Sequence, residues 1–160
     1  MIIFWFCMII DFFLRIRLLC LRLTNAFTQK RISYEISMQR KLLIACTEGD
    51  VWTVRYLALI MSSCSFVNEF GRNPLMKACF HGHLDIMKIL YTHGSVIDVT
   101  RAKKNGATPM FIACCYGHFE IVKWLYKNGA AMHVTKPNNK RVTPMYIVCM
   151  KGHFEIVQWL

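Results

Sequence analysis

Apolar and polar residues alternate with helical spacing in the most regular part of the chain. Met110, Ala113 and Cys114 fall on one face of a short helix, which the pattern predicts to begin at Pro109. Thr108 can cap that helix because its oxygen can accept a hydrogen bond from the first free N–H groups. Proline suits the next position, where the missing N–H has no helical partner to lose. The sequence therefore predicts a first helix of about two turns.

A second amphipathic pattern follows Gly117, which supplies the left-handed residue that commonly ends a helix. Its apolar positions recur at i, i+1 and i+4: Ile121, Val122 and Leu125. Its polar positions are Glu120, Lys123 and Lys127. Gly129 ends this helix, and a polar stretch over residues 133–141 leads onward. The predicted unit is helix, turn, helix and extended loop.

This unit recurs at a spacing of 35 residues. The three clearest copies are Asn73–Leu90, Thr108–Leu125 and Thr143–Leu160. A weaker copy precedes them, which gives repeats over about 39–70, 71–105, 106–140 and 141–160, the last one incomplete. A period of this length is typical of a solenoid, in which each repeat buries its apolar face against its neighbours. We therefore expect function to lie on a surface rather than in a deep pocket.

The pattern G-x-T-P-x-x-x-A-x-x-x-G-H-x-x-I-V-x-x-L-x-x-x-G-A resembles the ankyrin repeat. The residues that carry the resemblance are Gly106, Thr108, Pro109, Ala113, Gly117, His118, Ile121, Val122, Leu125, Gly129 and Ala130. The resemblance implies an all-α, ankyrin-repeat helical solenoid with extended inter-repeat hairpin loops over residues 38–160. An apolar and basic segment, residues 1–37, precedes it.

Three features depart from the ankyrin pattern. Met76, Phe111 and Tyr146 replace the histidine of the T-P-L-H motif, so we expect a less rigid corner there. The family's usual period is about 33 residues, and the two additional residues fall in the loop between Gly94 and Gly106. We therefore expect long hairpin fingers. Arg141 stands where the other repeats have a turn glycine, which predicts a strained entry to the fourth repeat.

The two ends of the sequence raise separate questions. The sequence stops at Leu160 within an expected helix, which suggests a fragment, a truncated product or a frayed end that pairs with another copy. Residues 1–10 are apolar, but the uninterrupted run is too short for a spanning helix. Residues 1–23 could act as a poor signal anchor, or as an amphipathic helix on a membrane or beside the first repeat. A further interpretation is that Met38 is the true start and residues 1–37 are untranslated.

The net charge indicates the kinds of partner the chain could bind, and the cysteine placement indicates its cellular compartment. The formal net charge of +11 over 160 residues favours an acidic protein, a nucleic acid or an anionic membrane as partner. Four of the eight cysteines take equivalent positions in successive repeats: Cys46, Cys79, Cys114 and Cys149. Helices in contact lie about 8–10 Å apart, too far for a disulfide. We expect these cysteines to pack in the core in reduced form, in the cytoplasm or nucleus.

Nothing in the sequence indicates catalysis, a cofactor or a metal. His83, His118 and His153 lie one repeat apart, which is too far for them to share a metal ion. The sequence contains no glycine-rich phosphate loop, no H-E-x-x-H motif and no serine elbow. The acidic residues are scattered rather than paired for acid–base chemistry. We expect a protein that is not an enzyme.

The loops between repeats are basic. The two clusters are Arg101, Lys103 and Lys104, and Lys136, Lys140 and Arg141. Only Asp98 opposes them, so they form either a cationic stripe along a groove or a solvated surface. Recognition of a protein partner with an acidic surface is our leading hypothesis. Nucleic-acid binding is less favoured because the cations lack interleaved aromatic residues, and a membrane-tethered adaptor anchored by residues 1–23 is the other alternative.

The ankyrin resemblance implies partner contacts on the fingers and on the exposed face of each first helix. The implied residues are Glu69, Phe70, Arg72, Phe80, His81, Lys104, Asn105, Ala107, Cys115, Tyr116, Asn139, Lys140, Val142, Met150 and Lys151. Phe80, Tyr116 and Met150 are the apolar candidates for a binding hot spot.

Overall fold

A computed structural model describes residues 27–61, 63–94 and 96–160, and the chain divides into two units, residues 1–38 and 39–160. Residues 27–38 of the first unit are helical, and their side chains are largely exposed. The expected anchor over residues 1–23 lies outside the described residues. Within the described ranges, every helix is too short or too polar to cross a bilayer.

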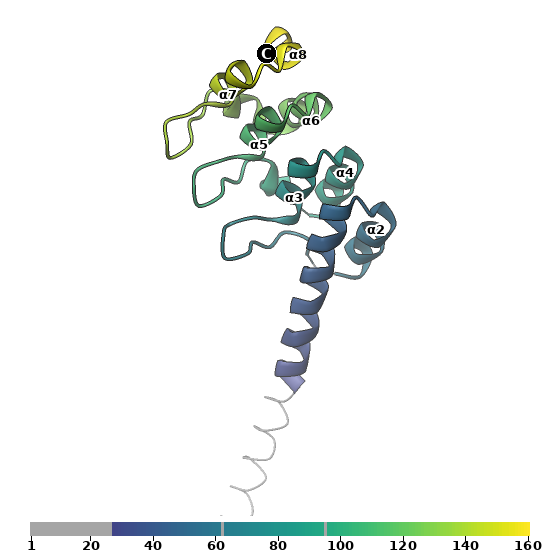
Figure 1. The fold of residues 1–160 in the computed structure, drawn as a ribbon. Helices are drawn as coiled ribbons and strands as arrows, with labels where there is room; N and C mark the ends of the chain where they lie inside the picture. Colours follow the sequence, from purple (N-terminus) through teal and green to yellow (C-terminus); the bar gives the residue numbers. More distant parts are fainter. Residues whose placement is uncertain (1–26, 62, 95) are drawn as a thin grey trace, which may run out of the picture. The chain divides into compact units, whose positions relative to one another are not determined.

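The second unit is a series of helix pairs. The pairs are residues 39–48 with α2 (Val51–Ile60), α3 (Pro74–His81) with α4 (Leu84–Thr92), α5 (Pro109–Tyr116) with α6 (Phe119–Leu125), and α7 (Pro144–Lys151) with α8 (Phe154–Trp159). Each pair from α3 onward stacks on the one before it, and the connecting loops project together on one side (Figure 1). The described residues include no strand. The all-α solenoid prediction is confirmed.

Each first helix after the first repeat begins with a side-chain cap followed by proline. Asn73 Oδ1 accepts a hydrogen bond from Met76 N at 2.7 Å. Thr108 Oγ1 accepts from Phe111 N at 3.2 Å, as the sequence predicts, and Thr143 Oγ1 repeats the arrangement in α7. These short helices therefore start at fixed residues, which holds the repeats in register.

A glycine–histidine pair joins consecutive repeats. Gly117 ends α5 in the left-handed conformation, with φ of 73°. The imidazole of His153, from the next repeat, lies over it so closely that a Cβ on Gly117 would be 2.6 Å from the ring. His153 Nε2 also lies 3.4 Å from the carbonyl oxygen of Cys115. His118 and His83 contact the preceding repeat in the same way. The recurring histidines thus connect one repeat to the next.

The cysteine series lines the core, as expected, in three of its four positions. Cys46, Cys79 and Cys114 are fully buried, and all six described cysteines are free thiols. Burial raises the pKa of the Cys46 and Cys114 thiols to about 12, and it also raises that of Cys79. Cys79 Sγ donates to the carbonyl oxygen of Pro109 in the next repeat. Cys149, in the last repeat of the sequence, is exposed, so the prediction of a core position is wrong there.

The segment after the second helix of the second and third repeats forms a short 3-10 helix rather than a polar loop. A wide turn, η2 (Tyr126–Ala130), leads into a 3-10 helix, η3 (Ala131–Val134), in which His133 and Val134 are buried. The predicted loop over residues 133–141 therefore begins too early. The equivalent 3-10 helix of the second repeat is η1 (Val96–Val99). These short helices contact the first helices, which explains their burial.

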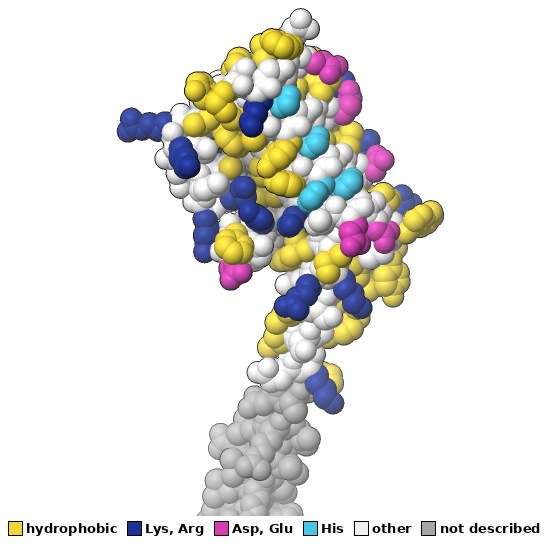
Figure 2. Space-filling view, in the orientation of Figure 1, with side chains coloured by type: hydrophobic (Ala, Val, Ile, Leu, Met, Phe, Trp, Pro, Cys, Tyr) yellow, Lys and Arg dark blue, Asp and Glu magenta, His cyan; other side chains and the backbone are white. Residues whose placement is uncertain are grey.

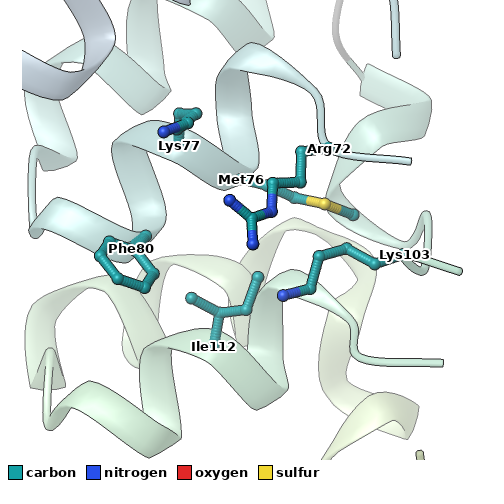
Figure 3. A pocket seen from close by; sticks show the side chains of 6 residues that line it. All are labelled: Arg72, Met76, Lys77, Phe80, Lys103 and Ile112. Atoms are coloured by element: carbon teal, nitrogen blue, oxygen red, sulfur yellow. The ribbon is translucent and has the colours of Figure 1, made fainter. Parts of the chain in front are cut away.

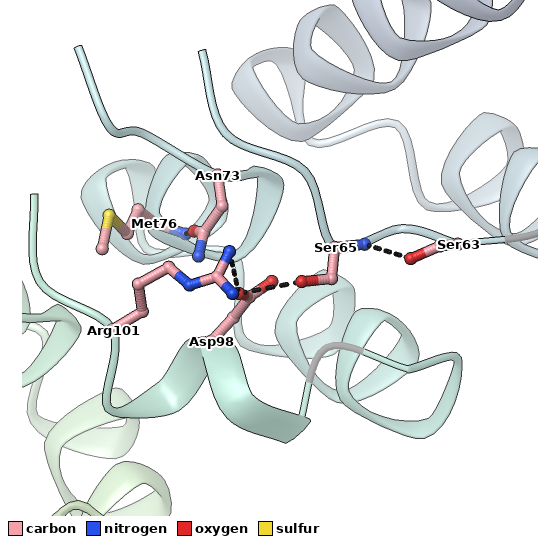
Figure 4. Close-up of polar contacts among 6 residues, drawn as sticks. All are labelled: Ser63, Ser65, Asn73, Met76, Asp98 and Arg101. Atoms are coloured by element: carbon pink, nitrogen blue, oxygen red, sulfur yellow. Dashed lines mark hydrogen bonds and ion pairs between the residues drawn. The ribbon is translucent and has the colours of Figure 1, made fainter. Parts of the chain in front are cut away.

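Asp98 of η1 is a buried carboxylate rather than a counter-charge on the loop surface. Its Oδ1 accepts a hydrogen bond from Ser65 Oγ at 3.1 Å and lies 3.3 Å from Arg101 Nη1 (Figure 4). The loop containing Ser65 is held in turn by Ser63 Oγ, which accepts from Ser65 N. Asp98 therefore connects the second repeat to the loop that precedes it, and it neutralises Arg101.

The inter-repeat loops, which we call the fingers, end in tight turns at residues 68–72, 103–107 and 138–142, each closed by two backbone hydrogen bonds. Asn68 N donates to Arg72 O, Lys103 N to Ala107 O, and Asn138 N to Val142 O, each at 2.9 Å. Gly71 and Gly106 take the left-handed conformation in the first two turns. Arg141 takes it in the third, with φ of 62°, so the strained entry expected at this residue is present.

Candidate protein-binding groove

The exposed ends of the first helices carry an aromatic pair. Phe80 at the end of α3 and Tyr116 at the end of α5 contact each other, with ring centroids 4.4 Å apart. Their side chains remain 40% and 48% exposed. Figure 2 shows hydrophobic and histidine side chains gathered side by side on this face, with Lys and Arg side chains next to them. An apolar centre with a polar border is typical of a protein-binding surface.

Histidines extend the aromatic surface along the repeats. The rings of His81 and His83 stack with centroids 6.1 Å apart, and those of Tyr116 and His118 stack at 6.3 Å. Partial burial, followed by the charge of Lys77, lowers the pKa of His81. Where the structure describes the chain, it brings together no group of three metal-binding side chains. The histidines therefore contribute ring surface and inter-repeat contacts.

A small cationic pocket opens beside Phe80, between α3 and the finger at residues 103–107. Its volume is about 80 Å³. It is lined by Arg72, Met76, Lys77, Phe80, Lys103 and Ile112 (Figure 3). The Arg72 guanidinium and the Lys103 ammonium group point toward each other across it. Partial burial and then the neighbouring charge of Arg72 lower the pKa of Lys103. We call this feature the cationic pocket.

The comparisons with known proteins agree with this geometry. A family model described as ankyrin repeats in three copies matches residues 42–136, which is more than half of the chain. The chain belongs to the ankyrin-repeat family. Ankyrin repeats generally act as protein–protein interaction modules and are typically not catalytic. The fourth helix pair, α7 and α8, continues the same ankyrin arrangement beyond the matched span. A comparison with curated proteins gives no significant match.

Most residues implied as partner contacts by the ankyrin pattern are accessible. The exposed ones are Glu69, Phe70, Arg72, Phe80, His81, Lys104, Asn105, Tyr116, Asn139, Lys140, Met150 and Lys151, whereas Cys115 and Val142 are half-buried. Ala107 differs, because only 2% of its surface is exposed. Its side chain therefore does not contribute to the outer surface, although its backbone closes the finger turn.

The six loop cations do not form one uniform ankyrin-finger stripe. Arg101 is paired with the buried Asp98, and Lys103 points into the cationic pocket. The remaining four are exposed: Lys104, Lys136, Lys140 and Arg141. Adjacent fingers are joined, because Asn139 N donates to Asn105 O at 3.1 Å and Asn139 Nδ2 donates to Lys104 O at 3.0 Å. The charge is thus divided between the ion pair with Asp98, the cationic pocket and the exposed surface of the fingers.

Sequence reasoning missed Lys77 and Ile112 as residues that line the cationic pocket, and it treated Lys103 only as part of a loop. Comparing residues position by position in the 35-residue register would have revealed Lys77. In that register Lys77 takes the position of Ile112 and Ile147. Because the following ankyrin units have isoleucine there, a lysine at this position suggests a role other than apolar packing.

Proposed function

We propose that this chain binds a protein partner along the groove formed by the ends of α3, α5 and α7 and by the fingers. The observation that carries the proposal is the Phe80–Tyr116 pair, which is packed and yet about half accessible. Fixed aromatic side chains lose little conformational entropy on binding, and such residues supply much of the affinity of protein interfaces. Met150 extends this surface to the fourth repeat, with 59% of its surface exposed.

The charge around the groove favours a partner with an acidic surface. The cationic pocket lies beside the aromatic pair, and exposed lysines follow on the fingers. Opposite charge on the partner would speed encounter and set its orientation, while the apolar centre would supply affinity. The described cysteines are all free thiols, which suits a reducing compartment, so we propose the cytoplasm or nucleus as the site of action.

An affinity capture from cell lysate tests this function. The full chain serves as bait, with and without nuclease, and captured molecules are identified by mass spectrometry. We expect a nuclease-resistant protein that is lost from Phe80→Ala and Tyr116→Ala, because each change removes half of the aromatic pair. Trp52→Ala is the matched control, since Trp52 is an exposed aromatic residue on the outer helix α2.

Three other results would count against the proposal. Capture that disappears with nuclease would favour nucleic-acid binding. Recovery with lipid vesicles that depends on residues 1–23 would favour a membrane-tethered adaptor. A partner equally retained by the Tyr116 and Phe80 variants would place the interface elsewhere on the chain.

A further inference from the structure

The cationic pocket is built from three positions at which the chain departs from its own repeat pattern. Arg72 stands where the following repeats have Ala107 and Val142. Lys77 stands where they have Ile112 and Ile147. Lys103 stands where the flanking fingers have Asn68 and Asn138. Arg72 and Lys77 lie at the start of the second repeat and Lys103 lies in the finger that ends it, yet all three residues line the same pocket.

The lysine at position 103 replaces an asparagine that stabilises the other fingers. Asn68 Oδ1 accepts hydrogen bonds from Phe70 N and Arg72 N, at 3.0 and 2.9 Å. Asn138 Oδ1 accepts from Lys140 N and Val142 N, at 2.9 and 3.1 Å. A lysine cannot accept these bonds, since its side chain only donates. Its finger instead relies on Asn105 Oδ1, which accepts from Ala107 N at 3.2 Å.

The three cations have no acidic counterpart in the pocket. None of the ion pairs formed by the described residues includes Arg72, Lys77 or Lys103. Met76, Phe80 and Ile112 supply the rest of the wall, so the pocket offers apolar surface around like charges. Like charges held together at a partly buried site favour an anion that neutralises them.

We propose that the cationic pocket receives the carboxylate of an aspartate or glutamate on the bound protein partner, with an apolar neighbour of that residue resting on Phe80 and Tyr116. This inference rests on the proposed function and assigns a chemistry to one part of the groove. The Arg72 guanidinium and the Lys103 ammonium group, which point toward each other, can both make charge-assisted hydrogen bonds to one carboxylate (Figure 3). A pocket of about 80 Å³ has room for a group of that size.

The following repeat supplies an internal contrast. Its equivalent positions hold Ala107, Ile112 and Asn138, which are all uncharged. The anion site therefore belongs to one place in the solenoid rather than to the fold in general. It lies beside the aromatic pair, which positions the acidic residue of the partner at the centre of the groove.

Fluorescence anisotropy with a labelled oligoglutamate peptide tests the pocket directly. The full chain is compared with a pocket variant that restores the repeat pattern, Arg72→Ala with Lys77→Ile and Lys103→Asn. The control is a finger variant with the same loss of charge, Lys104→Gln with Lys136→Gln and Lys140→Gln. Oligoglutamine of the same length reports binding without charge, and circular dichroism with urea unfolding reports folding of each protein.

We expect the pocket variant to bind oligoglutamate at least about tenfold more weakly, and the finger variant to lose less than about threefold, because charges gathered at one pocket outweigh charges spread over the fingers. If both variants lost oligoglutamate affinity equally, general charge attraction would explain the binding, and the proposed carboxylate site would be wrong. A single-stranded oligonucleotide that binds more tightly than oligoglutamate, and only when the pocket is intact, would overturn the choice of a protein carboxylate.

The single substitutions keep the test decisive if the triple variant is unstable. Lys77→Ile and Lys103→Asn each introduce a residue that the same fold already uses at the equivalent position, so each should fold. We expect each to weaken oligoglutamate binding, and an unchanged affinity in both would overturn the proposal. The partner captured from lysate distinguishes the carboxylate site from the proposed groove function. If the pocket variant still binds that partner and Tyr116→Ala does not, the carboxylate site is wrong while the groove function is retained.

Discussion

At the scale of single residues, the chain's internal register shows which positions carry backbone strain. Gly71 and Gly106 close their finger turns with positive φ, and Arg141 does so with a side chain attached. A left-handed conformation costs an L-residue roughly 1–2 kcal/mol. Glycine recovers that cost, although it also makes the unfolded chain more flexible. The third finger therefore stores strain that the other two avoid.

We predict that Arg141→Gly raises the free energy of unfolding by about 0.5–1 kcal/mol. The substitution relieves backbone strain in the folded protein, and the greater conformational entropy of glycine in the unfolded chain offsets part of that gain. Urea unfolding followed by circular dichroism measures the change. Arg141→Gln removes the same charge and keeps the Cβ, so it should leave stability nearly unchanged. Equal stabilisation by glycine and glutamine would show that charge repulsion, rather than backbone conformation, was the cause.

At the scale of elements, the 3-10 helix η3 gives the solenoid a pH-sensitive contact. It packs against α5 and α7, and it buries His133, whose Nδ1 has no hydrogen-bond partner. Burial, and then the charge of Lys136, lower the pKa of His133 below its ordinary value of 6.5. The folded protein therefore binds this proton less readily than the unfolded chain does.

The sign of the resulting pH dependence follows from that difference. The contribution of neutral His133 to the free energy of unfolding is complete above the ordinary histidine pKa. It falls as the pH drops below that value, because the unfolded chain takes up the proton first. We predict that the free energy of unfolding decreases between about pH 7.5 and pH 5.5, and that His133→Leu reduces this decrease. Urea titrations at the two pH values measure it. An identical decrease in the variant would assign the effect to other histidines.

The helices were predictable because their signals are local. Thr108 and Pro109 lie directly at the start of α5, and Gly117 lies directly after its end. The burial of His133 was not predictable in this way, because it arises from tertiary packing of η3 between α5 and α7 rather than from a local sequence signal. The cationic pocket was missed for the same reason. Arg72 and Lys103 are separated along the chain, and only the stacking of repeats brings them together.

At the scale of the whole molecule, stability is divided among interfaces between consecutive helix pairs. The α5 helix contacts α3 on one side and α7 on the other, whereas α6 contacts α8. The same neighbours are joined by His153 over Gly117 and by the Asn139 bonds between fingers. In such a solenoid the total stability is approximately a sum of repeat terms and nearest-neighbour terms.

This arrangement predicts the effect of removing residues 141–160. The shortened chain should lose the helical signal of α7 and α8, which contain eight and six residues, and keep that of α3 to α6. It should unfold at a lower urea concentration, because the face of α5 that packs on α7 would be exposed to water. Greater binding of a hydrophobic dye would report that exposure, and circular dichroism would report the retained helices. Complete loss of helical signal would contradict the nearest-neighbour description, since it would mean that the fourth helix pair is needed for repeats that it does not contact.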